Sequence, residues 1–472
     1  SQAITTTTTT TIRQRQRPSL FLLFVSLYIS NVESWSNPHN NNNKLNAQSL
    51  LKSVKETVVG VALTVTILGS NFDINVMPQQ QHQQQQQQIS MIQPKEVASA
   101  AVAPLADVGL REFLVKDGNE LLRLSLPTSL PTSKDPALLG DVGRQVQEAV
   151  ELVRLRLEQV GFSGKTTVWN ACLKEVNTAK QLIETPGMLK GIPTTTTSTA
   201  KALVDTTLTK LNSLGDAIRK QDIDATLKLQ EECSALVYDI RAMSLPRGVL
   251  PYNIPDEFKS YPQLRGRATV ECEIEKTNGR LFRMEDGQKQ KSIKLTMVLD
   301  GYHAPITTGN LVDLIQRKFY NGLPIMTAEE LIVQTGKPTI NGLDGFVDPT
   351  TRETRTIPLE IFYKNDAAPS YSYTSDDDMR ATESMALPFQ AYGAVGMAHD
   401  PEDPNTASSQ FWFLKWNQAL VAPSRNTLDG SQACMGYVTT NQQLLEQVQK
   451  GDAIVGMNVV DGLDNFVSNT NK

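Results

Sequence analysis

The chain is poor in the residues that build metal and redox sites. Its 472 residues include four cysteines and four histidines. The cysteines stand far apart and form no Cys-x-x-Cys pair, which argues against a zinc site or a redox motif. They are Cys172, Cys233, Cys272 and Cys434. We expect buried, unpaired thiols, with a disulfide as the alternative in an oxidising compartment, and we expect no metal and no cofactor.

The sequence also lacks an excess of positive charge and a long apolar run. Lys and Arg number 45 against 50 Asp and Glu, for a formal net charge of -5. Without a basic stripe to neutralise phosphates, a nucleic-acid partner is not expected. The apolar run Val58–Leu68 is about half the length that a membrane-spanning helix needs, so we expect no stable membrane span.

What is present begins with a targeting segment, residues 1–103. Arginines precede an apolar run, Leu20–Ile29, and Val32 and Ser34 suit the positions before a signal-peptidase cleavage. Trp35 would then open an Asn-rich stretch that resembles the bipartite plastid presequences of algae with complex plastids.

A second signal follows in the same segment. Val58–Leu68 has the features of another signal-peptide core, and the small residues of Ala98–Ala103 offer sites for a thylakoid processing peptidase. The low-complexity tract Gln79–Gln88 lies between them and predicts disorder. We interpret residues 1–103 as a bipartite presequence that contains this disordered tract. The alternative is one ordinary signal peptide followed by a disordered linker.

Residues 104–246 have the apolar spacing of a helical bundle. Three stripes carry it: Val142, Val146, Ala149, Val153, Leu157 and Val160; Leu203, Leu208, Leu211, Leu214 and Ile218; and Leu227, Leu229, Leu236, Val237 and Ile240. Their charged residues are scattered, which predicts solvated surface and no catalytic site, and Trp169 is interpreted as a core residue. A bundle without chemistry indicates a binding or regulatory element that docks a partner or the neighbouring domain.

Residues 247–264 form a Pro-rich connector, and residues 265–472 have the pattern of a β-rich domain. Arg267–Glu275 and Ser292–Leu299 alternate as strands, while Asn278 and Gly279 predict a hairpin turn that leads into a return strand, Arg280–Glu285. Thr307 is expected to open a helix. Many strands and few helices favour a closed barrel, because closure removes exposed sheet edges.

Several blocks of this domain resemble the cyclophilin family, in the family's order. They are Ala304–Leu311, Phe319–Gly322, Val333–Gly336, Ser409–Trp412, Leu428–Gly430 and Gly436–Val438. The preceding helical domain and the string Tyr261–Arg267 narrow the resemblance to the multidomain cyclophilins of the thylakoid lumen. The resemblance implies an α+β multidomain fold, in which a helical bundle precedes a cyclophilin-like closed β-barrel with capping helices.

The same resemblance implies peptidyl-prolyl cis-trans isomerase activity, a role in folding, and a place in the thylakoid lumen of a plastid. The implied partners are proline-containing lumenal polypeptides, with photosystem II subunits among the candidates, and within the chain the helical domain against the barrel. The positions that match the family's catalytic residues are Thr327 and Gln334. Those that match its substrate-binding residues are Leu331, Ile332, Ala398, His399, Gln410, Trp412, Thr427, Leu428 and Gln432.

Thr327 stands where the family has its catalytic arginine. A threonine can neither carry nor extend positive charge as a guanidinium does. The slot differs too: Leu331 and Ile332 replace Phe and Met, and Trp412, Thr427 and Gln432 replace Phe, Trp and His, respectively. We therefore expect weak or lost isomerase activity, with a non-catalytic peptide-binding chaperone or assembly scaffold as the alternative.

Two further residues bear on that expectation. Arg425, two positions before Thr427, is a candidate to supply the missing guanidinium. The lone His399 is interpreted as a residue of the groove rim or of a loop, in preference to a base or a metal ligand.

Overall fold

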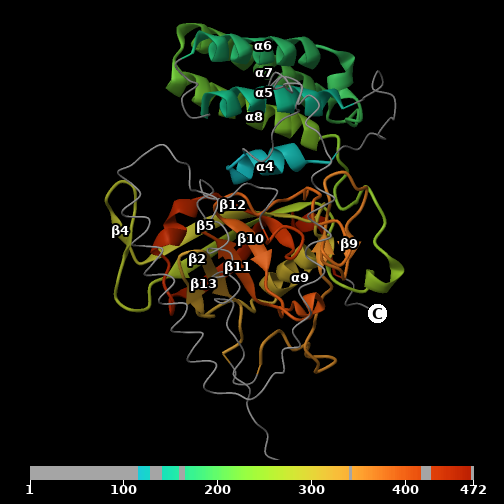
Figure 1. The fold of residues 1–472 in the computed structure, drawn as a ribbon, viewed down its shortest axis with the longest axis vertical. Coiled ribbons are helices and arrows are strands. Elements are labelled where there is room, and N and C mark those ends of the chain that lie inside the picture. Colours follow the sequence, from blue (N-terminus) through green and yellow to red (C-terminus); the bar gives the residue numbers. More distant parts are fainter. Residues whose placement is uncertain (1–114, 128–140, 159–164, 340–342, 416–426, 469–472) are drawn as a thin grey trace, which may run out of the picture. The chain divides into compact units, whose positions relative to one another are not determined.

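The computed structural model describes residues 115–127, 141–158, 165–339, 343–415 and 427–468. All of them belong to one unit of the chain, residues 101–472 (Figure 1). The expected presequence, Val160 of the first helical stripe and Arg425 lie outside the described residues. The expectations about cleavage sites and about a guanidinium from Arg425 therefore stay predictions.

Four helices form the helical part: α5 (Val142–Glu158), α6 (Thr166–Ile183), α7 (Thr197–Lys220) and α8 (Ile223–Ala242) (Figure 1). The three predicted stripes lie in α5, α7 and α8, and each contributes buried side chains to one shared core. Helix α6 was not among the predicted stripes, although Trp169, Cys172 and Val176 repeat at helical spacing. Trp169 is only 3% exposed, which confirms its interpretation as a core residue.

A short additional helix, α4 (Gly118–Ser125), connects the bundle to the sheet. Asp117 caps its start by accepting hydrogen bonds from the backbone N–H groups of Asn119 and Glu120. Gly118 lies directly against Tyr437, because a Cβ placed on this glycine would be 2.6 Å from the Cβ of that tyrosine. The absence of a side chain at Gly118 thus allows the helix to approach the sheet closely.

Charged residues of the helical part are not all solvated, contrary to the sequence-based expectation. Glu151 is fully buried and accepts hydrogen bonds from Arg123 Nε at 3.1 Å and from Gln147 and Gln230 at 2.9 and 2.8 Å. Burial raises the pKa of Glu120 to about 9, and the neighbouring carboxylate of Glu151 contributes to the same rise. The stripes could not reveal this network, because its members come from three helices that only the tertiary fold brings together.

The β-rich part contains an eight-stranded antiparallel sheet with the order β13-β2-β5-β12-β10-β11-β7-β6 (Figure 1). Its strands are β2 (Arg267–Glu275), β5 (Ser292–Asp300), β6 (Thr327–Ala328), β7 (Ile332–Thr335), β10 (Ala394–Met397), β11 (Phe411–Leu414), β12 (Cys434–Thr440) and β13 (Ala453–Asp461). Smaller pairs join β1 (Gln263–Leu264) to β14 (Phe466–Val467), β3 (Phe282–Arg283) to β4 (Lys289–Gln290), and β8 (Glu360–Ile361) to β9 (Ser370–Tyr371).

Helix α9 (Pro305–Gln316) confirms the expected helix and buries Leu311, Leu314 and Ile315 in the core of the β-rich part. It begins two residues before the predicted Thr307, because proline is favoured in the first turn of a helix. Short 3-10 turns occur at Pro186–Leu189, Asp256–Phe258, Pro404–Thr406, Gln442–Gln447 and Leu463–Asn465.

The predicted hairpin around Asn278 and Gly279 was wrong in its pairing. Strand β2 pairs along its whole length with β5, and the intervening residues form the small β3–β4 hairpin. The turn of that hairpin contains Gly287, whose φ of 81° suits a left-handed turn position. Gly279 has a similar φ of 75°, so glycine turns occur at both positions. The long β2–β5 pairing determines that the hairpin forms around Gly287.

Backbone hydrogen bonds join the two ends of the sheet. Ile325 N–H donates to the carbonyl of Asp452 at 2.7 Å, and Ile454 N–H donates to the carbonyl of Leu323 at 2.9 Å. These bonds link the segment before β6 to the start of β13, so the sheet is strongly curled. Its interior holds α9 side chains together with Phe411 and Phe413.

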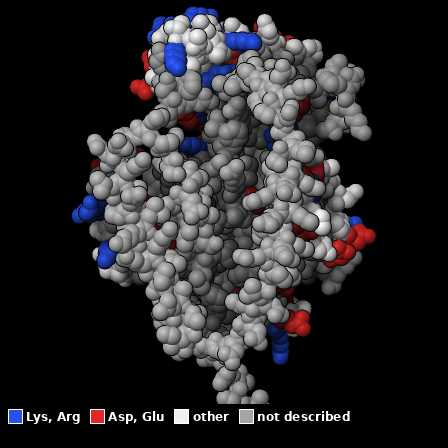
Figure 2. All heavy atoms as spheres, in the orientation of Figure 1, with Lys and Arg blue, Asp and Glu red and all other residues white. Residues whose placement is uncertain are grey.

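All four cysteines are buried and unpaired, which was the first of the two expectations for them. Within the described residues, no helix combines the length and apolar character required to cross a bilayer. Basic and acidic side chains are interspersed over the described surface in the view of Figure 2. The described residues contain no cluster of three or more His, Cys, Asp or Glu side chains suited to a metal ion.

Candidate functional site

Strands β7, β11 and β10 lie side by side and carry much of the predicted site. In register, Trp412 of β11 faces Gln334 of β7 on one side and Gly396 of β10 on the other. Because side chains alternate along a strand, Phe411 and Phe413 enter the core while Trp412 and Leu414 share the outer face. The outer face of these three strands is therefore the candidate groove.

An apolar cluster covers this outer face. It brings together five predicted wall residues, namely Leu331, Ile332, Ala398, Trp412 and Leu428. The same cluster contains side chains of α4, including Leu121, Leu122 and Leu124. Ile332 and Trp412 are each only 6% exposed, so these two walls are largely covered in this structure.

The ring of Phe389 packs directly on the indole of Trp412. Their rings stack with centroids 4.9 Å apart and an interplanar angle of 27°. The indole also lies across Gly396, where an added Cβ would be 2.2 Å from the indole Cζ2 atom. Room for the large Trp412 side chain thus depends on the missing side chain of Gly396.

Amide side chains border the cluster beside Thr327. Thr327 lies in β6 directly opposite Gln334 of β7, and it is half-buried. Gln334 Nε2 donates to Gln410 Oε1 at 3.1 Å, and Gln410 Nε2 donates to the carbonyl of Asp344 at 2.7 Å. These two hydrogen bonds hold both glutamines at the edge of the outer face, and Thr327 is the cross-strand partner of Gln334.

The remaining predicted residues form the opposite rim. Thr427 is exposed, and Leu428 accepts a backbone hydrogen bond from Gln432 at 3.0 Å, which closes the loop between them. His399, directly after Ala398, contacts this loop through Ser431 and Gln432. We call residues Thr427–Gln432 the rim loop. His399 therefore contacts the rim loop from the segment that follows β10, and its role stays a prediction.

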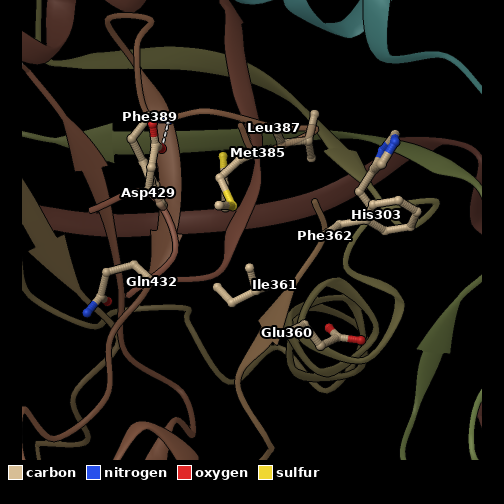
Figure 3. Close-up of a pocket in the computed structure, with 10 residues that line it drawn as sticks. His303, Glu360, Ile361, Phe362, Met385, Leu387, Phe389, Asp429 and Gln432 are labelled. Carbon is tan, nitrogen blue, oxygen red and sulfur yellow. Dashed lines mark hydrogen bonds between the residues drawn. The ribbon is translucent and has the colours of Figure 1, made fainter. Parts of the chain in front are cut away.

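A small pocket is lined in part by Asp429 and Gln432 of the rim loop (Figure 3). Its lining includes two carboxyl groups, those of the buried Glu360 and of the half-buried Asp429. Asp429 accepts a hydrogen bond of 2.7 Å from the backbone N–H of Phe389, drawn as a dashed line in Figure 3. Glu360 caps the start of α9 by accepting from the N–H groups of Ile306 and Thr307.

Burial raises the pKa of both pocket carboxyls. The pKa of Asp429 rises to about 7, and its bond from Phe389 opposes that rise. The pKa of Glu360 also rises to about 7, because burial outweighs its hydrogen bonds from Thr307 and Ile306. Both carboxyl groups therefore change between the protonated and the ionised form near neutral pH.

Sequence reasoning missed Phe389, Gly396 and Asp429. Phe389 lies in an irregular segment without periodicity, so its stacking on Trp412 had no local signal. Gly396 could have been found, since a glycine inside a strand often marks a close approach by another group. Asp429 stood in a block used for the resemblance, but its partner is 40 residues earlier in the chain.

Comparison with known proteins decides the family. The family described as cyclophilin type peptidyl-prolyl cis-trans isomerase/CLD matches residues 282–463. A putative thylakoid lumen peptidyl-prolyl cis-trans isomerase of Synechocystis sp., sll0408, is 35% identical over 357 residues, which cover 75% of this chain and 85% of the relative. The chain belongs to the cyclophilin family.

A second relative of this cyclophilin is a chloroplastic protein. The peptidyl-prolyl cis-trans isomerase CYP38 of Arabidopsis thaliana is 28% identical over 417 residues, which cover 88% of this chain and 86% of the relative. Both similarities extend beyond the residues that match the family, so they include part of the chain before the cyclophilin domain.

Proposed function

We propose that this cyclophilin binds proline-containing polypeptides in the thylakoid lumen of a plastid and isomerises their X-Pro bonds only weakly. One observation carries the proposal: Thr327, at the arginine position, lies opposite Gln334 at the border of the candidate groove. The named lumenal and chloroplastic relatives support the location. Photosystem II subunits are candidate clients, as the sequence resemblance to lumenal cyclophilins implies.

The chemistry explains why this position matters. Rotation about a peptide bond must overcome roughly 18–20 kcal/mol of amide resonance. A guanidinium aimed at the twisting amide stabilises the nitrogen as it loses conjugation, and this is electrostatic catalysis without a covalent step. Loss of one such preorganised donor costs about 3 kcal/mol, or roughly a hundredfold in rate. A neutral, short hydroxyl at Thr327 provides much less stabilisation.

A second function, a non-catalytic chaperone or assembly scaffold, is favoured by the cover over the slot. Phe389 stacks on Trp412, and Ile332 is buried, so little apolar floor is exposed for a proline ring. The Gln334–Gln410 pair still offers amide groups to an extended peptide. In this function the groove holds a chain segment, and the helical part recruits partners or docks on the cyclophilin domain.

We further propose that the curled sheet closes into a barrel and that the domain boundaries follow the composition changes. The backbone bonds of Ile325 and Ile454 across the two sheet ends support closure. The distinct cores of the helical and β-rich parts support the division.

Isomerase activity tests the first function. NMR exchange spectroscopy on an Ala-Ala-Pro-Phe peptide would measure kcat/KM for the wild type, for Thr327→Arg and for an ordinary cyclophilin. We expect the wild type to be at least tenfold slower than the ordinary cyclophilin. Thr327→Arg should raise kcat/KM severalfold, because it returns a charged donor to the groove.

The matched control is Thr206→Arg, which adds the same charge at an exposed threonine of α7. It should leave the rate unchanged. Wild-type turnover at ordinary cyclophilin levels would refute the weak-catalysis proposal. Peptide binding without exchange, seen as shifts of Gln334 and Gln410 signals, would instead select the scaffold function.

A further inference from the structure

Two glutamates lie in the turn that connects Thr327 to the wall of the candidate groove. Glu329 and Glu330 stand between β6, which contains Thr327, and the wall residue Leu331. The N–H of Glu329 donates to the carbonyl of Ile332 at 2.9 Å and closes the turn. Both glutamates are exposed, and neither carboxylate has a hydrogen bond or an ion pair within the described part of the chain. Two uncompensated negative charges therefore border the groove.

A second acidic segment is the loop after β10. Its start is fixed beside the amide pair, because the N–H of Ala398 donates to the carbonyl of Gln410 at 2.9 Å. Glu402 and Asp403 follow in this loop, and both are exposed. Asp403 accepts a hydrogen bond from the N–H of Asn405 at 2.9 Å, a contact that leaves its charge in place.

A third acidic segment packs against the rim loop. The N–H of Ser375 donates to the carbonyl of Gly430 at 2.7 Å, so the chain around Ser375 lies directly on that loop. Asp376 and Asp377 come next in the chain and are exposed. Acidic residues thus accompany the β6–β7 turn, the loop after β10 and the rim loop.

The cations of the neighbouring segments are already paired within the protein. Lys337 follows β7, Arg380 follows the third acidic segment, and Lys415 donates its backbone N–H to the carbonyl of Leu331. Their carboxylate partners are Asp344, Asp366 and Glu446, respectively. An arginine at position 327, two residues before Glu329, would add a counter-charge to the border, whereas threonine adds none.

A binding surface with one sign of charge at its border favours ligands of the opposite sign and disfavours those of the same sign. We propose that Glu329 and Glu330 are specificity-determining residues of the candidate groove, which selects proline-containing segments that carry Lys or Arg within three residues of the proline. The proposal deepens the proposed function and rests on it, because it requires a groove that binds such segments.

Peptide affinities measured by fluorescence anisotropy with the full chain test the proposal. The two labelled peptides are Lys-Ala-Ala-Pro-Phe-Lys and Glu-Ala-Ala-Pro-Phe-Glu. In about 50 mM salt we expect the basic peptide to bind about three- to tenfold more tightly, the effect of two exposed ion pairs. About 500 mM salt should reduce the difference, because salt screens exposed charges. Equal affinities in low salt would overturn the selectivity.

Paired variants assign the selectivity to the two glutamates. Glu329→Gln/Glu330→Gln keeps the side-chain shapes, removes both charges and should lose most of the preference. The matched control is Glu285→Gln/Asp286→Asn, which removes the same charge from the exposed turn of the β3–β4 hairpin and should keep the wild-type preference. A preference that survives in the first variant, or that falls equally in both, would overturn the assignment.

Failure of the proposed function has a different signature. A third peptide, Lys-Ala-Ala-Ala-Phe-Lys, lacks the proline and should bind severalfold more weakly than its proline counterpart. If neither proline peptide binds, or if the proline makes no difference, the groove does not recognise proline and both proposals fail. If the two proline peptides bind equally and more tightly than the third, only the charge selectivity fails.

Discussion

At the scale of single residues, the candidate groove is shaped by a compensation between a large and an absent side chain. Trp412 extends across Gly396 and stacks on Phe389, and only the missing Cβ at Gly396 leaves space for the indole. The cover over the slot is therefore a property of three residues together. None of them separately predicts it.

Gly396→Ala should displace the indole of Trp412, because the new Cβ would lie within van der Waals overlap of it. We expect the free energy of unfolding to fall by about 1–3 kcal/mol, the usual cost of overpacking a core. Urea unfolding with tryptophan fluorescence would measure it. The matched control is Gly456→Ala in β13, where the nearest atom to an added Cβ is 3.9 Å away.

A double-mutant cycle assigns the effect to Trp412. In a Trp412→Phe background the smaller ring should accept alanine at position 396 at lower cost. An equal cost in both backgrounds would show that the strain arises elsewhere in β10.

At the scale of elements, α4 connects the two parts of the chain through polar as well as apolar contacts. Arg123 binds Glu151 of α5 and Glu231 of α8, while Arg241 of α8 donates to the carbonyl of Arg123 at 2.7 Å. The opposite face of α4 contributes leucines to the cluster on the sheet. This short helix is therefore held by its surroundings rather than by its own propensity.

Glu151→Ala should destabilise the protein by about 1–3 kcal/mol, because the buried Nε–H of Arg123 and the side-chain amide of Gln230 lose their acceptor, while Arg123 keeps its pair with Glu231. Glu148→Ala removes an exposed partner of Arg144 on the same helix and should change stability by less than about 1 kcal/mol. Chemical denaturation followed by circular dichroism compares the two. Equal costs would contradict a structural role for the buried network.

At the scale of the whole molecule, one buried ion pair joins several elements. Arg267 of β2 contacts Asp300 Oδ2 at 2.7 Å, and its guanidinium also bonds Ser125 of α4 and Tyr238 of α8 at 3.2 Å. Although burial opposes ionisation of Asp300, Arg267 and His303 lower its pKa. A lowered pKa keeps Asp300 ionised at mildly acidic pH, so the pair with Arg267 persists there.

Mild acidification should stabilise the protein. The folded pKa values of Glu360 and Asp429, about 7, lie above their unfolded values near 4, so the folded state binds more protons between pH 4 and 7. The free energy of unfolding should therefore fall as pH rises through 7, by about 1–3 kcal/mol for each group between pH 5 and 8. Urea midpoints at pH 5.5 and 8.0 would measure the change.

The control for this pH dependence is Asp429→Asn, which retains the shape of the side chain without its titration. Its stability should vary less with pH than that of the wild type. If the wild type were instead more stable at pH 8.0 than at pH 5.5, the raised pKa values of the two pocket carboxyls could not be correct.

Much of the fold and the family was predictable from sequence because those features rest on local pattern. Helical stripes, the strands Arg267–Glu275 and Ser292–Leu299, the buried thiols and the cyclophilin blocks each depend on residues close together in the chain. The assignment of Thr327 to the arginine site rests on the same kind of evidence, its place within a block, and stays a prediction. Periodicity and block order are properties of the residue order alone, so they can be recognised without knowledge of the folded structure.

The remaining features required the tertiary structure because their partners are remote in sequence. The β2–β5 pairing replaced the predicted hairpin, Phe389 reached Trp412 from an irregular segment, and Glu151 was buried by side chains from other helices. His399 and Ser431 are 32 residues apart, yet the ring and the carbonyl are 2.9 Å from each other. Packing and hydrogen bonding act over a few ångströms in space, and only the folded chain establishes which distant residues come within that range.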